Sequence, residues 1–137
     1  MVKIIIVFCF ICSILTACFL STWDVRLVLT NDTQNKIRYF EEIMDKEKNL
    51  PNLVNCDKSQ LYSIEPNSDV IIRRQEKWEF SLRDHPEKIL RIYIINEDSL
   101  AKYGTCFIFK KGIFMKRFDF NYYDLEKVNW KLEFSNK

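Results

Sequence analysis

Residues 89–95 read ILRIYII, the most continuously apolar stretch of the chain after its first twenty residues. A short apolar run between polar segments is typical of a strand that is buried within a sheet. We therefore expect residues 89–95 to form the central strand of the fold.

Further strands are expected on the N-terminal side of this run. Residues 25–30 and 37–40 are rich in strand-forming residues and flank a polar turn, which predicts a first hairpin. Residues 60–64 and 69–73 flank a turn sequence that contains Pro66, which predicts a second hairpin. Sequential hairpins of this kind pair antiparallel.

Alternation of apolar and polar residues predicts two more strands. One is the segment WEFSL at residues 78–82, and the other is WKLEF at residues 130–134, which is expected to close the sheet. The fold class expected from these segments is mainly β, a small antiparallel sandwich or curled sheet with one or two short helices.

Capping residues indicate where the helices lie. Residues 96–99 can cap a brief helix that ends at Gly104, and residues 121–128 carry an Asn cap with Asp124 at the third position. Two segments remain open between alternatives. Residues 40–48 fit a short amphipathic helix or a solvated loop, and residues 105–118 fit a hairpin or a helix followed by a strand. Residues 49–58 are expected to be a loop.

The N-terminus has the layout of a secretory signal. A short positive start precedes an apolar run that turns polar near residue 21, which is marginal for a membrane-spanning helix of ~20 residues. Leu15-Thr16-Ala17-Cys18 resembles the lipobox of bacterial lipoproteins, in which the cysteine receives the lipid. The expected organisation is a signal peptide at residues 1–17, a lipidated tether at 18–24 and one β-rich domain at 25–137.

Composition limits the classes of function. The formal net charge is only +2, which gives no long-range field for a nucleic acid, so no nucleic-acid partner is expected. The single histidine, His85, has no cysteine or second histidine near it in sequence, so neither a metal site nor a cofactor is expected. Cys56 and Cys106 are either a disulfide in an exported domain or two separate thiols.

Several charged and aromatic clusters are candidate sites, and each also has a structural interpretation. The segment from Arg73 to Trp78 places three cations beside an aromatic ring, which suits a phosphate or a sugar acid or else a polar sheet edge. The remaining candidates are the basic pairs Lys110-Lys111 and Lys116-Arg117, the acidic pairs Glu41-Glu42 and Glu97-Asp98, the sequon at Asn31–Thr33, and the tryptophans Trp23, Trp78 and Trp130. None of them makes a credible catalytic dyad, so no catalytic residue is expected.

The C-terminal sequence DLEKVNWKLEF at residues 124–134, together with Leu15–Cys18, resembles small lipoproteins of unknown function from anaerobic Gram-negative bacteria. The similarity covers about residues 18–135 and departs at residues 104–115. It implies a lipid-anchored protein of the cell envelope. Phe19 is not the aspartate that resembles an inner-membrane retention signal, which favours the outer membrane. Surface export in related bacteria is associated with acidic residues just after the cysteine, and residues 19–23 contain none, which favours the periplasmic face.

Two classes of function follow. The first is a non-enzymatic binding or envelope-interaction module that is held to membrane lipid through acylated Cys18 and contacts another envelope protein. The second is an envelope-polymer hydrolase or transferase, or a carbohydrate-binding accessory protein. Perturbed titratable groups gathered in one cleft favour the enzyme, an exposed apolar patch without them favours the module, and carbohydrate capture requires Trp78 or Trp130 on the surface.

Overall fold

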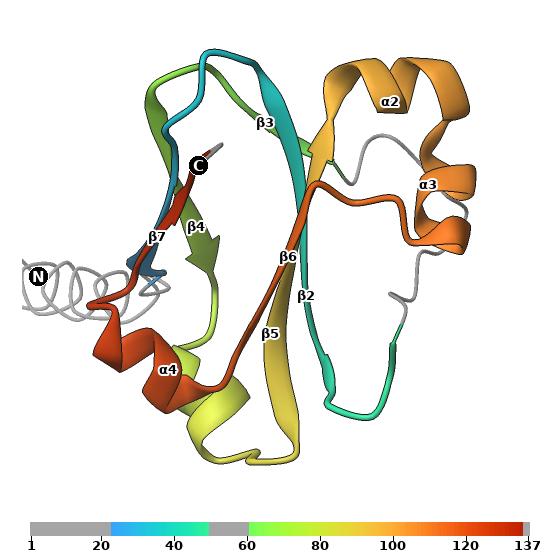
Figure 1. Cartoon of the computed structure of the whole chain (residues 1–137). Helices are drawn as coiled ribbons and strands as arrows, with labels where there is room; N and C mark the ends of the chain where they lie inside the picture. Colours follow the sequence, from blue (N-terminus) through green and yellow to red (C-terminus); the bar gives the residue numbers. More distant parts are fainter. Residues whose placement is uncertain (1–22, 50–60, 136–137) are drawn as a thin grey trace, which may run out of the picture.

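A computed structural model describes residues 23–49 and 61–135, and its strands form two sheets that face each other (Figure 1). The three-stranded sheet has the order β4-β1-β7, with β4 Ser68–Arg74, β1 Asp24–Asn31 and β7 Lys131–Phe134. The four-stranded sheet has the order β3-β2-β5-β6, with β3 Tyr62–Ile64, β2 Ile37–Asp45, β5 Lys88–Asn96 and β6 Lys116–Phe120. The expected fold class, a β-rich sandwich with short helices, is confirmed.

Four short helical segments complete the described part of the chain: η2 Glu79–Arg83, α2 Glu97–Tyr103, α3 Thr105–Lys111 and α4 Tyr122–Lys127. Helices α2 and α3 lie beside the four-stranded sheet on the side away from the other sheet, whereas η2 and α4 lie at one end of the sandwich (Figure 1). None of the helices in the described ranges is long and apolar enough to cross a membrane.

Strand β5 is buried on both faces, as the sequence ILRIYII predicted. Leu90, Ile92 and Ile94 point into the core between the two sheets, and Tyr93 and Ile95 pack under α2 and α3 in a second cluster. All five side chains are fully buried. The helices explain why residues 92–95 are apolar at successive positions, because a strand covered on both sides buries the side chains of both faces.

Both expected hairpins are wrong, although their strands exist. β1 pairs with β4 and β7, whereas β2 pairs with β3 and β5, so the chain changes sheet between β1 and β2. It changes sheet again at the turn between β3 and β4, where Asn67 has a φ of 50°. These turns therefore join the two layers instead of neighbouring strands.

The buried side chain of Asn31 explains why the chain crosses here. Its amide group donates hydrogen bonds to the carbonyl oxygens of Asn35 at 2.9 Å and Glu65 at 3.0 Å, one on each crossing. Its Oδ1 accepts from the Thr33 hydroxyl at 2.8 Å. The Asn31–Thr33 sequon is thus a structural turn, and the Asn31 amide is enclosed by protein.

Two other expectations also need correction. Residues 78–82 are not a strand: Trp78 is the N-cap of η2, and Leu82 packs in the core while Phe80 is exposed. Residues 40–45 are neither helix nor loop, because they continue β2 and pair with β5 through Asp45. In both segments the spacing of apolar residues suits a helix as well as a strand, and pairing with β5 makes residues 40–45 part of a strand.

The helix caps agree with the sequence. Asn96 accepts hydrogen bonds from the amides of Asp98 and Ser99 at the start of α2, which ends at Gly104. Asn121 and Asp124 form a reciprocal capping box on α4. Residues 105–118 resolve to the second alternative, helix α3 followed by strand β6, and Lys131–Phe134 form the expected one-sided strand. The loop expected at residues 49–58 lies outside the described residues beyond Asn49.

Candidate functional site

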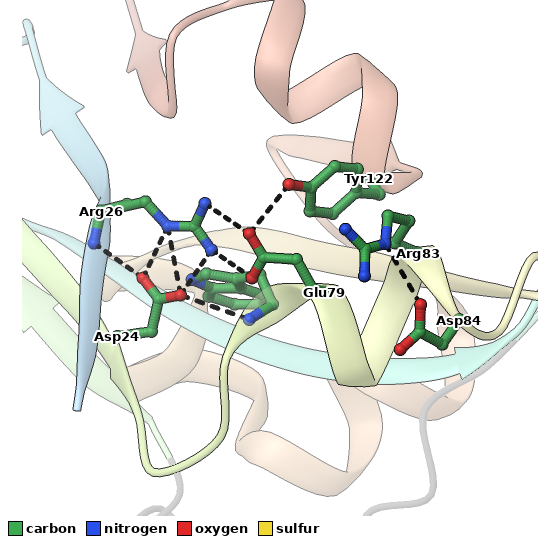
Figure 2. A network of polar contacts seen from close by, with 7 residues as sticks. Asp24, Arg26, Glu79, Arg83, Asp84 and Tyr122 are labelled. Carbon is green, nitrogen blue, oxygen red and sulfur yellow. Dashed lines mark hydrogen bonds and ion pairs between the residues drawn. The ribbon is translucent and has the colours of Figure 1, made fainter. Parts of the chain in front are cut away.

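Charged side chains join β1, η2 and α4 at the end of the sandwich where β1 begins (Figure 2). The Arg26 guanidinium donates to Asp24 Oδ2 at 2.6 Å and to Glu79 Oε2 at 2.7 Å. Tyr122 donates its hydroxyl to Glu79 Oε1 at 3.0 Å, and the backbone amide of Trp78 donates to Asp24 Oδ2 at 3.3 Å. Each acid in this network therefore has a donor on another element.

The electrostatics of the network are those of a structural clamp. Burial works to raise the pKa of Asp24, but hydrogen bonds from Arg26 and Trp78 outweigh it and hold that pKa below the ordinary value. The hydrogen bond from Arg26 likewise lowers the pKa of Glu79. Arg26 also lies 4.2 Å from the centroid of the Trp130 ring. Because these groups satisfy one another, the network stabilises the fold and leaves no acid poised for proton transfer.

A different arrangement occurs around Glu41, which the sequence presents only as half of the acidic pair Glu41-Glu42. On β2 the residues Ile37, Tyr39 and Ile43 pack in the core between the sheets, and alternation places Glu41 on the same face. An open crevice of about 410 Å³ lies beside it, here called the Glu41 crevice. It is lined by Trp23, Glu41, Arg73, Arg74, Gln75 and Glu76.

Each of the two inner charged groups of this crevice has one polar atom without a hydrogen bond. Glu41 Oε2 and Arg74 Nε are buried, and neither has a hydrogen-bond partner among the described residues. Burial raises the pKa of Glu41 to about 7, against the opposing effect of Arg74. Burial also lowers the pKa of Arg74, whose guanidinium lies 5.0 Å from the centroid of the Trp78 ring. Buried polar atoms without a partner are rare in folded proteins, and a bound ligand or an ordered water is one explanation for them.

A second open crevice, of about 350 Å³, lies next to the first and shares Trp23 with it. Its other lining residues are Asp24, Val25, Arg26, Lys77 and Glu79. Most of its charged groups already belong to the clamp described above. The Glu41 crevice is therefore the stronger candidate for a binding site.

The three cations that precede Trp78 in the sequence are divided between the two crevices. Arg73 and Arg74 line the Glu41 crevice, but Lys77 lines the neighbouring one. Trp78 itself is fully buried and packs 6.0 Å from Trp130, centroid to centroid. Because Trp78 and Trp130 are both core residues, the surface platform that those two were considered for does not exist; the exposed tryptophan is Trp23.

The other candidate residues have structural surroundings. His85 is in an exposed turn with Nδ1 3.1 Å from Glu87 Oε1, and within residues 23–49 and 61–135 no three potential metal ligands come together. Glu41 and Glu42 point to opposite faces of β2, and Glu97 binds Arg38 at the start of α2. These acids form no dyad.

The second basic cluster lies away from the start of β1. Lys110 and Lys111 are in the last turn of α3, and Arg117 pairs with Asp119 on β6 at 3.3 Å. Figure 1 places α3 on the opposite side of the sandwich from the three-stranded sheet. The cluster is therefore not positioned beside an anchor attached just before β1.

Cys18 and Cys56 lie outside the described residues. Cys106, the second residue of α3, is disulfide-bonded, and all other cysteines of the chain lie outside the described ranges. The Cys56–Cys106 pairing stays a prediction.

Comparison with known proteins gave no matching family model, no matching curated protein and no matching solved structure. The resemblance to small bacterial lipoproteins thus stays a prediction that rests on the sequence motifs alone.

Proposed function

We propose that this chain is a lipoprotein of the bacterial cell envelope, anchored through acylated Cys18, whose β-rich domain is a non-enzymatic binding module held against the membrane. The observation that carries the proposal is the position of Trp23. This side chain is 48% exposed and immediately precedes β1, only five positions after the cysteine of the Leu15–Cys18 motif.

The short spacing limits where the domain can lie. Five residues reach at most about 18 Å when fully extended. A lipid on Cys18 would therefore keep the N-terminal end of β1 at the membrane surface. Tryptophan is favoured at this interface because its ring is apolar and its N–H is polar, so an exposed Trp23 suits the position.

The outer face of the three-stranded sheet has a composition that supports this orientation. Val28 pairs with Ile71 on β4 and with Lys131 on β7, and Ile71 is 44% exposed. Farther along the same face, Thr30 pairs with Asp69 and Glu133. The apolar and basic end thus lies nearest Trp23, and the acidic end lies farthest from it. Basic residues favour contact with anionic headgroups, and acidic residues oppose it.

The anchor is tested on the protein isolated from membranes of a Gram-negative host. Mass spectrometry of the N-terminal peptide is expected to find a diacylglyceryl-modified Cys18 as the first residue. The Cys18→Ser variant is expected to leave the membrane fraction. A native chain that retains Met1 would refute the proposal.

The orientation is tested separately by fluorescence quenching. The acylated protein is placed in vesicles that contain lipids brominated near the headgroup. Quenching of tryptophan emission is expected, and Trp23→Phe is expected to abolish it because Trp78 and Trp130 are buried. Equal quenching in the variant would show that the domain presents another face to the membrane.

One observation favours a second candidate, an envelope-polymer hydrolase. Glu41, whose pKa burial raises to about 7, and Glu76 line the same crevice, and glycoside hydrolysis uses one carboxylic acid beside one carboxylate. In this case Glu41→Gln abolishes cleavage of a cell-wall glycan and Glu42→Gln preserves it. Absence of cleavage by the unmodified protein removes this candidate and leaves the binding module.

A further inference from the structure

We propose that the Glu41 crevice binds a small hydroxylated carboxylic acid of the acidic-sugar class, with Arg74 as the partner of the carboxylate. This inference deepens the binding part of the proposed function and rests on it. It is carried by two residues that line the crevice, Arg74 and Glu41, each of which has a buried polar atom, Nε and Oε2 respectively, without a hydrogen-bond partner among the described residues.

The first step concerns Arg74. The Nε–H group of Arg74 is a donor without an acceptor among the described residues. The neighbouring Trp78 ring lies beside the guanidinium but has no hydrogen-bond acceptor atom. A buried donor without a partner destabilises the protein by ~1–3 kcal/mol, so an acceptor that enters the crevice binds favourably. A carboxylate matches the guanidinium best, because two parallel N–H groups can donate to its two oxygens.

The second step concerns charge. Arg73 and Arg74 line the crevice together with Glu41 and Glu76. Because burial raises the pKa of Glu41 to about 7, that carboxyl holds its proton for part of the time at neutral pH, and the crevice then has a small excess of positive charge. A single carboxylate neutralises this excess. A dianionic phosphate would exceed it and would lie close to Glu76.

The third step concerns the rest of the ligand. Glu41, Gln75 and Glu76 offer planar groups that donate to or accept from hydroxyl groups. The aromatic wall that a sugar needs comes from the exposed Trp23 and not, as the sequence suggested, from Trp78 or Trp130, which are buried. A sugar ring has hydroxyls around its edge and C–H groups on its face, which suit polar side chains and an aromatic face respectively. The volume of about 410 Å³ is within the range of small-molecule sites.

The test is isothermal titration of the full acylated chain in a polyoxyethylene detergent, which carries no sugar. The probes are D-glucuronate, D-glucose and D-glucose 6-phosphate, which share a ring and differ in the acidic group. Glucuronate is expected to bind at least tenfold more tightly than either of the others. Equal or tighter binding of glucose 6-phosphate would overturn the carboxylate assignment, and no binding of glucuronate would overturn the proposal.

Matched variants locate the site. Arg74→Lys keeps the charge but removes the planar guanidinium and is expected to weaken glucuronate binding at least tenfold, as is Glu41→Gln. Glu42→Gln on the opposite face of β2 and Arg117→Lys on β6 are expected to leave affinity unchanged. Unchanged affinity in both crevice variants would overturn the proposal. If a crevice variant fails to fold, Trp23→Phe gives the same test, because it changes an exposed residue of the crevice. The identity of the N-terminal peptide tests the anchor independently, so failure of one is distinguishable from failure of the other.

Discussion

Replacing Glu41 by Gln is expected to flatten the pH dependence of the free energy of unfolding by about 2.5 kcal/mol between pH 5 and pH 8. Glu41 lies on the core-facing side of β2, and one of its carboxyl oxygens has no hydrogen-bond partner among the described residues. Ionising this group in the folded protein is therefore costly, and an amide of nearly the same shape does not ionise.

The magnitude follows from the pKa. Burial raises the pKa of Glu41 from 4.5 to about 7. The folded state therefore holds the proton more tightly than the unfolded state. The contribution of Glu41 to stability is greatest below pH 4.5, falls as the pH rises from there to 7, and changes little above that value. Proton linkage over the part of this window between pH 5 and pH 8 gives about 2.5 kcal/mol.

The assay is urea unfolding at pH 5, 6.5 and 8, followed by the fluorescence of the buried Trp78 and Trp130. Arg74 faces Glu41 and stays charged throughout, so any constant cost of removing its neighbour cancels when the change with pH is compared. Glu42→Gln, on the opposite face of the strand, is the control and is expected to follow the unmodified protein.

The reasoning is refuted if Glu41→Gln and the unmodified protein lose stability in parallel between pH 5 and pH 8. That result would mean that Glu41 ionises near its ordinary pKa, and that the inner end of the crevice is well hydrated. The crevice would then lack the buried character on which its proposed role depends.

Three further predictions concern the scaffold and are measured by urea unfolding. Arg26→Met is expected to destabilise the protein by about 2 kcal/mol at pH 7, because Asp24 and Glu79 lose their donor. The loss is expected to be smaller at pH 3, because carboxyls whose pKa is lowered contribute stability at higher pH and lose that contribution as they become protonated. An equal loss at both pH values would contradict this. Asn121→Ala removes the capping box of α4 and is expected to cost about 1 kcal/mol, whereas no change would show that the helix does not depend on its cap. Gly112→Ala is expected to cost about 1 kcal/mol through backbone strain alone, since Gly112 has a φ of 66° and nothing lies within 4 Å of the position of a Cβ; a stabilised variant would contradict that conformation.

Local signals in the sequence predicted those elements whose conformation is decided locally. The run ILRIYII at residues 89–95 predicted β5, and Asn96, Gly104 and Asn121 predicted the ends of α2 and α4. At the helix ends a side chain determines structure within four residues of itself, and in β5 the apolar run itself indicates a buried strand. Elements with such local signals can be predicted from the sequence alone.

Strand partners were not predictable in the same way. The turns at residues 32–36 and 65–67 have the composition of hairpin turns, yet each carries the chain to the other sheet. The buried amide of Asn31 bridges the two crossings, and this depends on residues more than thirty positions away. A turn sequence alone does not contain that information.

The candidate site was missed for a related reason. Glu41 and Arg74 come from different sheets, and the sequence presents Glu41 as half of a solvated acidic pair in an ambiguous segment. One signal was available: if residues 37–43 are taken as a strand, Ile37, Tyr39 and Ile43 form an apolar face that also contains Glu41. An acid at such a position is a candidate for function.

The parallel pairing of β1 with β7 has a consequence for biogenesis. Val28 and Lys131, roughly a hundred positions apart, must meet before the middle strand of the three-stranded sheet has both neighbours. A nascent chain that has not yet delivered residues 131–134 cannot complete this layer and remains open. Under the export that we propose for this chain, the late arrival of β7 would leave the three-stranded sheet incomplete until the C-terminal residues have followed the rest of the domain across the membrane.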